Sequence, residues 1–341
     1  MAKYFFCVFA VLAANKILTR RPVLSVALHI ISFFLCNVFL LFLNLNLAAV
    51  IFLALMHAVS EIFYIVAQNV IFAVRAESGT AAVIQAPFTA GVLLAGIVKH
   101  GFSLDFRFSF WLILIALAFH IVSLLPLLFD RQIPLLNAQS LQNEIKRPYK
   151  NPKRDMFHIS LGLFNGVVFE VIPLYLVFSQ NALETSLIIF ASIEISRLFF
   201  TKAGEHLYKK GHYNFAMALS TSLFFILLAL AAVFDGTGPA PIFCAVAAAA
   251  APLNFVPKFS AYVKAVKEEN RIHYNQLRRE FLMSAGKILA PAAFLIFGAF
   301  VAAIFLGAVA GVGIFFASYN YKLKKAAAMS APAAETEIKT E

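Results

Sequence analysis

A row of polar side chains, spaced three and four residues apart, lies within the apolar stretch of residues 47–74. Its members are His57, Ser60, Glu61, Tyr64 and Gln68. This spacing places them on one face of a helix. Burial makes the charged form of a carboxylate costly, so Glu61 is suited to take up and release a proton that His57 can share. Three interpretations stay open: a buried polar face whose groups hydrogen-bond to neighbouring helices, the lining of a substrate cavity, and a cavity lining coupled to protons.

A second carboxylate, Glu170, lies centrally in the apolar stretch of residues 157–178, five residues after Asn165. A charge in the middle of such a stretch is costly unless it faces protein or water, so we expect Glu170 and Asn165 to line a cavity. In the following stretch, Glu194 and Arg197 stand three residues apart and are suited to form an ion pair. That pair fits a structural lock between helices as well as a substrate contact.

Catalytic and cofactor-binding motifs do not accompany these residues. The sequence has no GxSxG, phosphate-binding loop or HExxH motif, and its three cysteines lack metal-ligand spacing. We therefore expect no enzymatic activity, no cofactor and no metal. The run Arg278-Arg279-Glu280 precedes an apolar stretch and is suited to salt bridges at a cytoplasmic gate, whereas we expect Lys287 to anchor a helix end.

The composition indicates which solvent these elements meet. Hydrophobic residues make up 62% of the 341 residues, charged residues only 13%, and the mean hydropathy is +0.84. This small number of charged side chains cannot cover the water-exposed surface of a protein of this size. Lipid must therefore be part of the solvent. The net charge of +11 belongs to no separate basic domain, which argues against a nucleic-acid partner.

Apolar stretches follow one another along nearly the whole chain and predict an all-α integral membrane fold with about eleven transmembrane helices. The predicted spans cover residues 4–18, 22–43, 47–74, 79–98, 108–129, 157–178, 183–201, 213–234, 239–263, 280–298 and 300–321. Lysine and arginine gather in alternate loops, which places those loops and the C-terminus in the cytoplasm and the N-terminus outside. The opposite loops hold only Lys3, Lys99 and Arg107. We expect a plasma membrane or a bacterial inner membrane.

The only long polar segment between spans divides the chain into two bundles. Residues 1–129 form the predicted N-terminal half with about five spans, and residues 157–325 form the C-terminal half with six. Residues 130–156 make a cytoplasmic linker, and residues 326–341 a disordered cytoplasmic tail. The halves also share short matches at nearly equal separations, such as Ile51-Phe52 with Ile242-Phe243, which suggests an internal repeat.

Two halves joined by a cytoplasmic linker resemble the major facilitator superfamily of transporters. The resemblance extends to a degraded form of that family's motif, a short loop with a glycine, an acidic residue and a basic pair. Residues 203–211 read AGEHLYKKG, and residues 15–21 read NKILTRR without the glycine and the acid. The resemblance implies gating roles for five charged residues of these two segments. They are Arg20, Arg21, Glu205, Lys209 and Lys210.

The resemblance implies a secondary transporter that moves a small solute by rocking two bundles around a midplane site, with proton coupling left open. The chain departs from the family because only one short span precedes the first motif-like segment, so the first helix of the family is missing. Alternative functions are a transport-inactive receptor or scaffold with this fold, and a membrane-embedded transferase.

Overall fold

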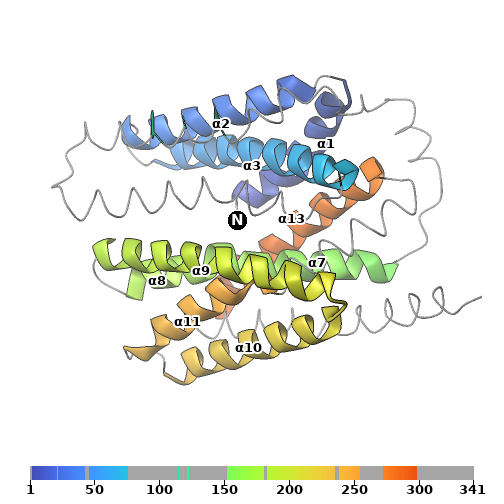
Figure 1. The fold of residues 1–341 in the computed structure, drawn as a ribbon. Helices are drawn as coiled ribbons and strands as arrows, with labels where there is room; N and C mark the ends of the chain where they lie inside the picture. The colour runs from blue at the N-terminus through green and yellow to red at the C-terminus, as the bar shows by residue number, and fades with distance from the viewer. Residues whose placement is uncertain are drawn as a thin grey trace, which may run out of the picture.

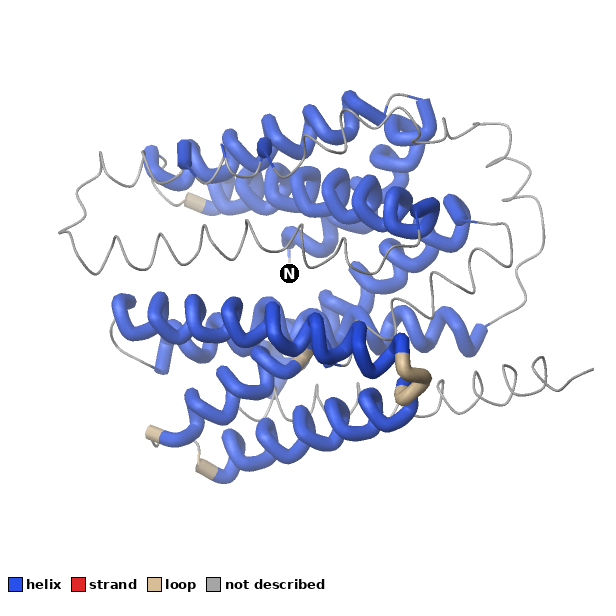
Figure 2. The backbone as a smooth tube through the Cα atoms, viewed as in Figure 1, coloured by secondary structure: helices blue, strands red, loops and turns tan. Residues whose placement is uncertain are grey.

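The computed structural model describes most of both predicted halves. The described residues are 2–20, 22–42, 46–75, 152–179, 183–234, 238–253 and 272–297, with isolated positions at 114, 115, 118, 121 and 122. Helices and short turns make up all of these residues, and no strand occurs among them (Figure 2). The all-α prediction is therefore confirmed for this part of the chain.

Three helices represent the N-terminal half: α1 (Ala2–Arg20), α2 (Pro22–Phe42) and α3 (Leu47–Arg75). Pro22 opens α2, a position where the missing N–H of proline costs nothing. Asn46 caps α3, since its Oδ1 accepts a hydrogen bond from the N–H of Ala49 at 2.8 Å. The apolar stretches predicted at 4–18, 22–43 and 47–74 are thus confirmed as helices.

The C-terminal half begins with one continuous helix that contains a π turn. It comprises α7 (Pro152–Gly166), η1 (Val167–Val171) and α8 (Ile172–Ser179). The N–H of Ile172 donates to the oxygen of Val167, five residues earlier, instead of the usual four. The wider turn directly precedes Pro173, whose ring would clash with a carbonyl one α-helical turn back. The proline accounts for the position of the π turn.

Four more helices follow: α9 (Leu183–Lys209), α10 (Tyr213–Val233), α11 (Pro239–Ala250) and α13 (Ile272–Phe297). Helix α9 ends at Lys209, two residues before Gly211, which adopts a φ of 77°, and the N–H of His212 donates to the oxygen of Leu207 at 2.9 Å. This is the hydrogen-bond pattern of a glycine-terminated helix. The predicted helix end at residue 201 was wrong, because residues 203–209 continue the helix.

The other predicted spans fall into two groups. The spans at 157–178, 213–234 and 280–298 coincide with described helices, although α13 begins at Ile272 because its polar first two turns are helical as well. Most of 108–129 and the second part of 239–263 lie outside the described residues, as do 79–98, 300–321, most of the 130–156 linker and the tail.

Helix α13 lies between the two groups of helices. Figure 1 shows α1, α2 and α3 on one side of it and α7 to α11 on the other. Helix α13 packs against α7 of its own half and also against α1 and α3 of the N-terminal half. The C-terminal ends of α1, α3 and α9 and the N-terminal ends of α7, α10 and α13 share one end of the bundle (Figure 1). The basic residues near those helix ends therefore lie toward the same end.

Glycines bring α7 and α13 into close contact. A Cβ atom added at Gly162 would lie 2.2 Å from the oxygen of Met283, and one added at Gly286 would lie 2.1 Å from the oxygen of Ile159. Gly166 lies against Lys287 in the next turn, so the contacts run in the same order along both helices. The two helices are therefore parallel and touch through their backbones, a packing that small residues permit in membrane proteins.

The surface of the described helices is rich in large apolar side chains. Phe199, Val233 and Ile296 are each more than 70% exposed, and other exposed apolar residues occur on all the long helices. By length and composition, one described stretch is suited to cross a membrane, the 19 residues Leu47–Ile65. Further apolar helical stretches are shorter, namely Ala27–Cys36, His158–Val171, Leu219–Val233 and Pro239–Ala250. The count of eleven spans stays a prediction.

Candidate functional site

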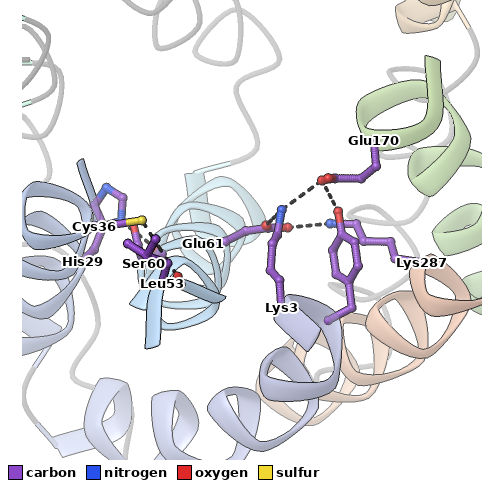
Figure 3. A network of polar contacts seen from close by, with 9 residues as sticks. Lys3, His29, Cys36, Leu53, Ser60, Glu61, Glu170 and Lys287 are labelled. Atoms are coloured by element: carbon purple, nitrogen blue, oxygen red, sulfur yellow. Dashed lines mark hydrogen bonds and ion pairs between the residues drawn. The ribbon is translucent and has the colours of Figure 1, made fainter. Parts of the chain in front are cut away.

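Five side chains from four helical segments meet where the two halves touch. They are Lys3 and Tyr4 of α1, Glu61 of α3, Glu170 of η1 and Lys287 of α13, and together we call them the central charge network. Figure 3 shows the two lysines and the two carboxylates pointing toward one another from the surrounding helices. The sequence predicted Glu61 and Glu170 as pathway residues, and the structure brings these two together through Lys3.

Short ion pairs hold the network together. The Nζ of Lys3 lies 2.8 Å from Oε2 of Glu61 and 2.9 Å from Oε1 of Glu170, so one ammonium bridges two carboxylates. The Nζ of Lys287 lies 2.6 Å from Oε1 of Glu61. Glu61 thus has a lysine on each carboxylate oxygen, whereas Glu170 has one lysine. Ammonium–carboxylate hydrogen bonds of this length are the strong, charge-assisted kind.

Tyr4 completes the network with both its hydroxyl and its ring. Its hydroxyl donates a hydrogen bond to Oε1 of Glu170. The face of its ring lies 4.6 Å from the Nζ of Lys3 and 5.2 Å from that of Lys287, within the range of cation–π attraction. Tyr4 therefore donates a hydrogen bond to the carboxylate of Glu170 and offers its aromatic face to the two ammonium groups.

The network balances its charges. The formal charges of two lysines and two glutamates sum to zero, and this pairing offsets the cost of removing each ion from water. The side chains are not equally enclosed: Lys287 is 11% exposed and Glu61 16%, whereas Glu170 is 31% exposed. Glu170 is therefore the member that solvent or a solute reaches most easily.

The backbone of each element explains how these side chains meet. Glu61 is the central residue of α3, and Lys287 follows Gly286 directly, at the close contact with α7. Glu170 lies in the π turn, which rotates it relative to an α-helical register. Lys3 stands in the first turn of α1, and Figure 1 marks the start of that helix in the middle of the bundle.

The other members of the predicted polar face of α3 point elsewhere. Ser60 is buried against α2, where Nδ1 of His29 lies 2.7 Å from the Ser60 carbonyl oxygen and 3.1 Å from the hydroxyl oxygen (Figure 3). The ring of Tyr64 packs 5.0 Å from that of His29. His57 is exposed, and the side chain of Gln68 lies outside the described part. A second polar contact thus joins α2 to α3 within the N-terminal half.

Asn165 and Arg197 lie in the C-terminal half. The Oδ1 of Asn165 is enclosed, and none of the described residues provides a hydrogen-bond partner for it. Arg197 donates from Nε to the oxygen of Ala248 at 3.1 Å, and its guanidinium lies 4.7 Å from the ring centre of Phe169. The side chain of Glu194 lies outside the described part, so the predicted pair with Arg197 stays a prediction.

Three of the predicted gating residues form ion pairs near the basic end of α13. Arg278 donates to both carboxylate oxygens of Asp155 on α7, from Nε at 2.7 Å and from a terminal nitrogen. The neighbouring Arg279 and Glu280 are buried and pair with each other at 2.8 Å. The Arg278 contact lies within the C-terminal half, so it joins the two helices that the glycines also bring together.

The remaining gating candidates lie at the ends of α1 and α9. Lys209 and Lys210 are exposed, whereas Glu205 is buried on α9, and its Oε1 has no hydrogen-bond partner within the part of the chain that the structure describes. Burial raises the pKa of the Glu205 carboxyl, although the nearby lysines of α9 act in the opposite direction. Arg20 ends α1 with its side chain undescribed, and Arg21 lies outside the described residues.

Sequence reasoning missed both lysines of the network. Lys3 was assigned to an external loop, but it belongs to α1 and pairs with two carboxylates. The anchoring role expected for Lys287 was wrong, because its ammonium pairs with Glu61 in the interior instead of reaching a helix end. A usable signal was the charge balance: two central carboxylates in apolar stretches require two cations nearby.

Among the described residues, no group of three or more histidines, cysteines or carboxylates is placed to hold a metal ion. The chemistry of the candidate site is therefore argued from its lysines, carboxylates and tyrosine. Neither protein-family models nor curated protein sequences give a significant match to this chain, so the argument for function rests on these residues alone.

Proposed function

We propose that this chain is a multi-pass membrane protein with about eleven spans that moves a small solute by alternating access, as a secondary transporter of the major facilitator type. The observation that carries the proposal is the central charge network, because its ion pairs join the two halves of the chain. Lys3 and Glu61 belong to the N-terminal half, and Glu170 and Lys287 to the C-terminal half.

The distribution of side chains supports a lipid environment. Large apolar residues such as Phe199 and Ile296 are exposed, while charged residues such as Arg279 and Glu280 are buried. Buried charged residues together with many exposed large apolar side chains are uncommon in water-soluble proteins. The basic residues near the ends of α1, α3, α9 and α13 lie toward one end of the bundle, as expected for a cytoplasmic side.

The network is suited to a transport cycle because ion pairs between two rigid bodies break and re-form without repacking a core. Lys3 already contacts one carboxylate of each half at nearly equal distances, 2.8 Å to Glu61 and 2.9 Å to Glu170. When the halves rock apart on one side, Lys3 can stay with Glu61 and leave Glu170 to another partner. Solute binding would supply the differential interaction that such a change requires.

The test is uptake into proteoliposomes that contain the purified protein. A broad panel of labelled solutes is offered to the wild type, and any saturable uptake is then measured for Glu61→Gln and Glu170→Gln. We expect both variants to lose most of the uptake, because each replaces a charge that the site balances. The exposed Lys202 of α9 provides the matched control, and Lys202→Gln should retain wild-type uptake.

Two outcomes would contradict the proposal. Folded wild-type protein that binds no solute of the panel and moves none would exclude a transporter. Uptake that stays unchanged in both glutamate variants would separate transport from the central charge network. Folding of each variant is checked beforehand by size-exclusion chromatography in detergent.

A further inference from the structure

We infer that the solute of this site is a small organic cation with N–H donors, such as an ammonium or a guanidinium, and that it binds Glu170 in place of Lys3. The inference rests on the proposed transport function and names the class of its substrate. It starts from the groups that surround Glu170, the most exposed member of the central charge network.

The first argument is that Glu170 can exchange its cation. Lys3 is its ion-pair partner at 2.9 Å, and the same ammonium lies 2.8 Å from Glu61. If an incoming cation takes Glu170, Lys3 keeps its contact with Glu61, which then pairs with both lysines of the network. An incoming anion must instead compete with carboxylates for Lys3 or Lys287, whose side chains are 15% and 11% exposed against 31% for Glu170. The site is therefore more open to exchange of a cation than to exchange of an anion.

The second argument is that the helix that carries Glu170 offers an acceptor to a donor-bearing solute. The enclosed Oδ1 of Asn165, on the same continuous helix, has no hydrogen-bond donor among the described residues. Pro173 has no N–H and so cannot donate to a carbonyl of the preceding π turn as an ordinary residue would. An ammonium or guanidinium brings several N–H donors, whereas a solute with acceptors alone brings none.

The third argument is the ring of Tyr4. Its face already lies 4.6 Å and 5.2 Å from two ammonium groups, so it presents a surface that attracts cations. A cation at Glu170 would replace Lys3 against this ring or share it. The Tyr4 hydroxyl, which donates to Glu170, competes with the incoming solute for the carboxylate.

The experiment uses radiolabelled guanidinium, which keeps its charge at neutral pH and brings N–H donors to every edge. Binding to the purified full-length protein is measured by scintillation proximity. Transport is measured by counterflow, in which proteoliposomes are preloaded with unlabelled guanidinium and accumulate the labelled ion. Counterflow needs no knowledge of the coupling ion. Methanesulfonate, a permanent anion, and glycerol, a neutral solute, serve as comparison probes.

The expected result is saturable guanidinium binding and counterflow by the wild type. Glu170→Gln should weaken binding by about tenfold or more, the value of a hydrogen bond to a charged group. Tyr4→Phe removes the competing hydroxyl and should strengthen binding by about 2–10-fold. Because Tyr4→Phe is conservative, it tests the inference even if Glu170→Gln does not fold. Lys202→Gln serves again as the control that should not change binding.

Failure of this inference is distinguishable from failure of the proposed function. Saturable counterflow of methanesulfonate or glycerol without guanidinium binding would overturn the cation site and leave a transporter. Guanidinium binding that neither Glu170→Gln nor Tyr4→Phe changes would overturn the assignment to Glu170. Absence of binding and counterflow for all three probes would overturn the cation site, and the broad panel described above then decides whether the chain transports anything.

Discussion

Helix α13 has two faces that are held in different ways. Toward α7 it packs backbone against backbone, with Gly162 and Gly286 leaving no room for a Cβ atom. Toward α1 and α3 it contributes Lys287 to a network of ion pairs. The first contact lies within the C-terminal half, and the second joins the two halves.

The difference teaches which contact is able to open. Close packing is lost completely once two helices separate, because dispersion forces decline steeply with distance. Ion pairs can exchange partners, and the network contains one ammonium that already contacts two carboxylates. We therefore expect α7 and α13 to move as one body and the boundary between α13 and the N-terminal half to be where conformational change occurs.

The largest effect is expected from filling the glycine contact. Gly286→Leu places a side chain where a Cβ atom would lie 2.1 Å from the oxygen of Ile159, and backbone cannot retreat as a flexible side chain can. We expect a loss of more than about 4 kcal/mol of stability, seen as loss of the monodisperse peak in size-exclusion chromatography. Gly238→Leu is the control, because nothing lies within 4 Å of a Cβ atom at Gly238. A stable Gly286→Leu protein would contradict the close contact.

A smaller but still large effect is expected from removing Lys287. Lys287→Gln leaves Glu61 with Lys3 alone, and loss of one partner of a buried ion pair typically costs about 3–5 kcal/mol. Thermal unfolding in detergent measures the loss, with Lys202→Gln as the exposed-lysine control.

The double variant Lys287→Gln with Glu61→Gln sharpens this test. Removing both charges leaves no uncompensated ion between α13 and α3, so we expect it to be more stable than Lys287→Gln alone. Strictly additive losses would show that the two side chains do not interact, and the ion pair between the halves would be disproved.

The sequence predicted the helices and the central carboxylates, but not the lysines that pair with them. Apolar stretches located the described helices, because hydropathy follows directly from burial or contact with lipid. Glu61 and Glu170 were recognised as central because a carboxylate in an apolar stretch is unusual. Their lysine partners were missed, since hydropathy shows that Lys3 and Lys287 lie near helix ends or loops in the chain, but not which residues approach them in space.

The end of α9 shows a different limit. Polar residues from 202 to 210 were interpreted as a loop, yet the helix continues to Lys209, and Gly211 follows it with a positive φ. The glycine was visible in the sequence and is the usual terminator of a helix, so the boundary was predictable from it. The close contact between Gly162 and Gly286 was not, because it joins residues far apart in the chain.

A moderate effect is expected at the boundary between the halves when Lys3 is replaced. Lys3→Gln leaves Glu61 paired with Lys287 and Glu170 with the Tyr4 hydroxyl, so the boundary should weaken without unfolding. The chemical labelling rate of Cys7 measures how easily this boundary opens, because the Cys7 side chain is fully buried in a cluster that includes Ile288 of α13. We expect N-ethylmaleimide to label Cys7 about tenfold faster, which corresponds to about 1.4 kcal/mol of easier opening.

Cys244 is the internal control for that measurement. It is equally buried, but it lies in the core cluster of the C-terminal half, away from the boundary. Peptide mass spectrometry follows both cysteines in one sample. Labelling that accelerates equally at Cys7 and Cys244 would indicate general unfolding, and the distinction between a packed contact and a reversible one would then be lost.

The smallest effect is expected from an ion pair on the glycine side of α13. Arg278 binds both oxygens of Asp155, but the two side chains are 31% and 20% exposed, and the glycine contact holds their helices together without them. Arg278→Met should therefore cost no more than about 1 kcal/mol in thermal unfolding, the usual value of a part-exposed pair. A loss as large as that of Lys287→Gln would mean that charge rather than close packing joins α7 to α13. The two faces of α13 would then be held in the same way, and the boundary that opens could not be assigned from their chemistry.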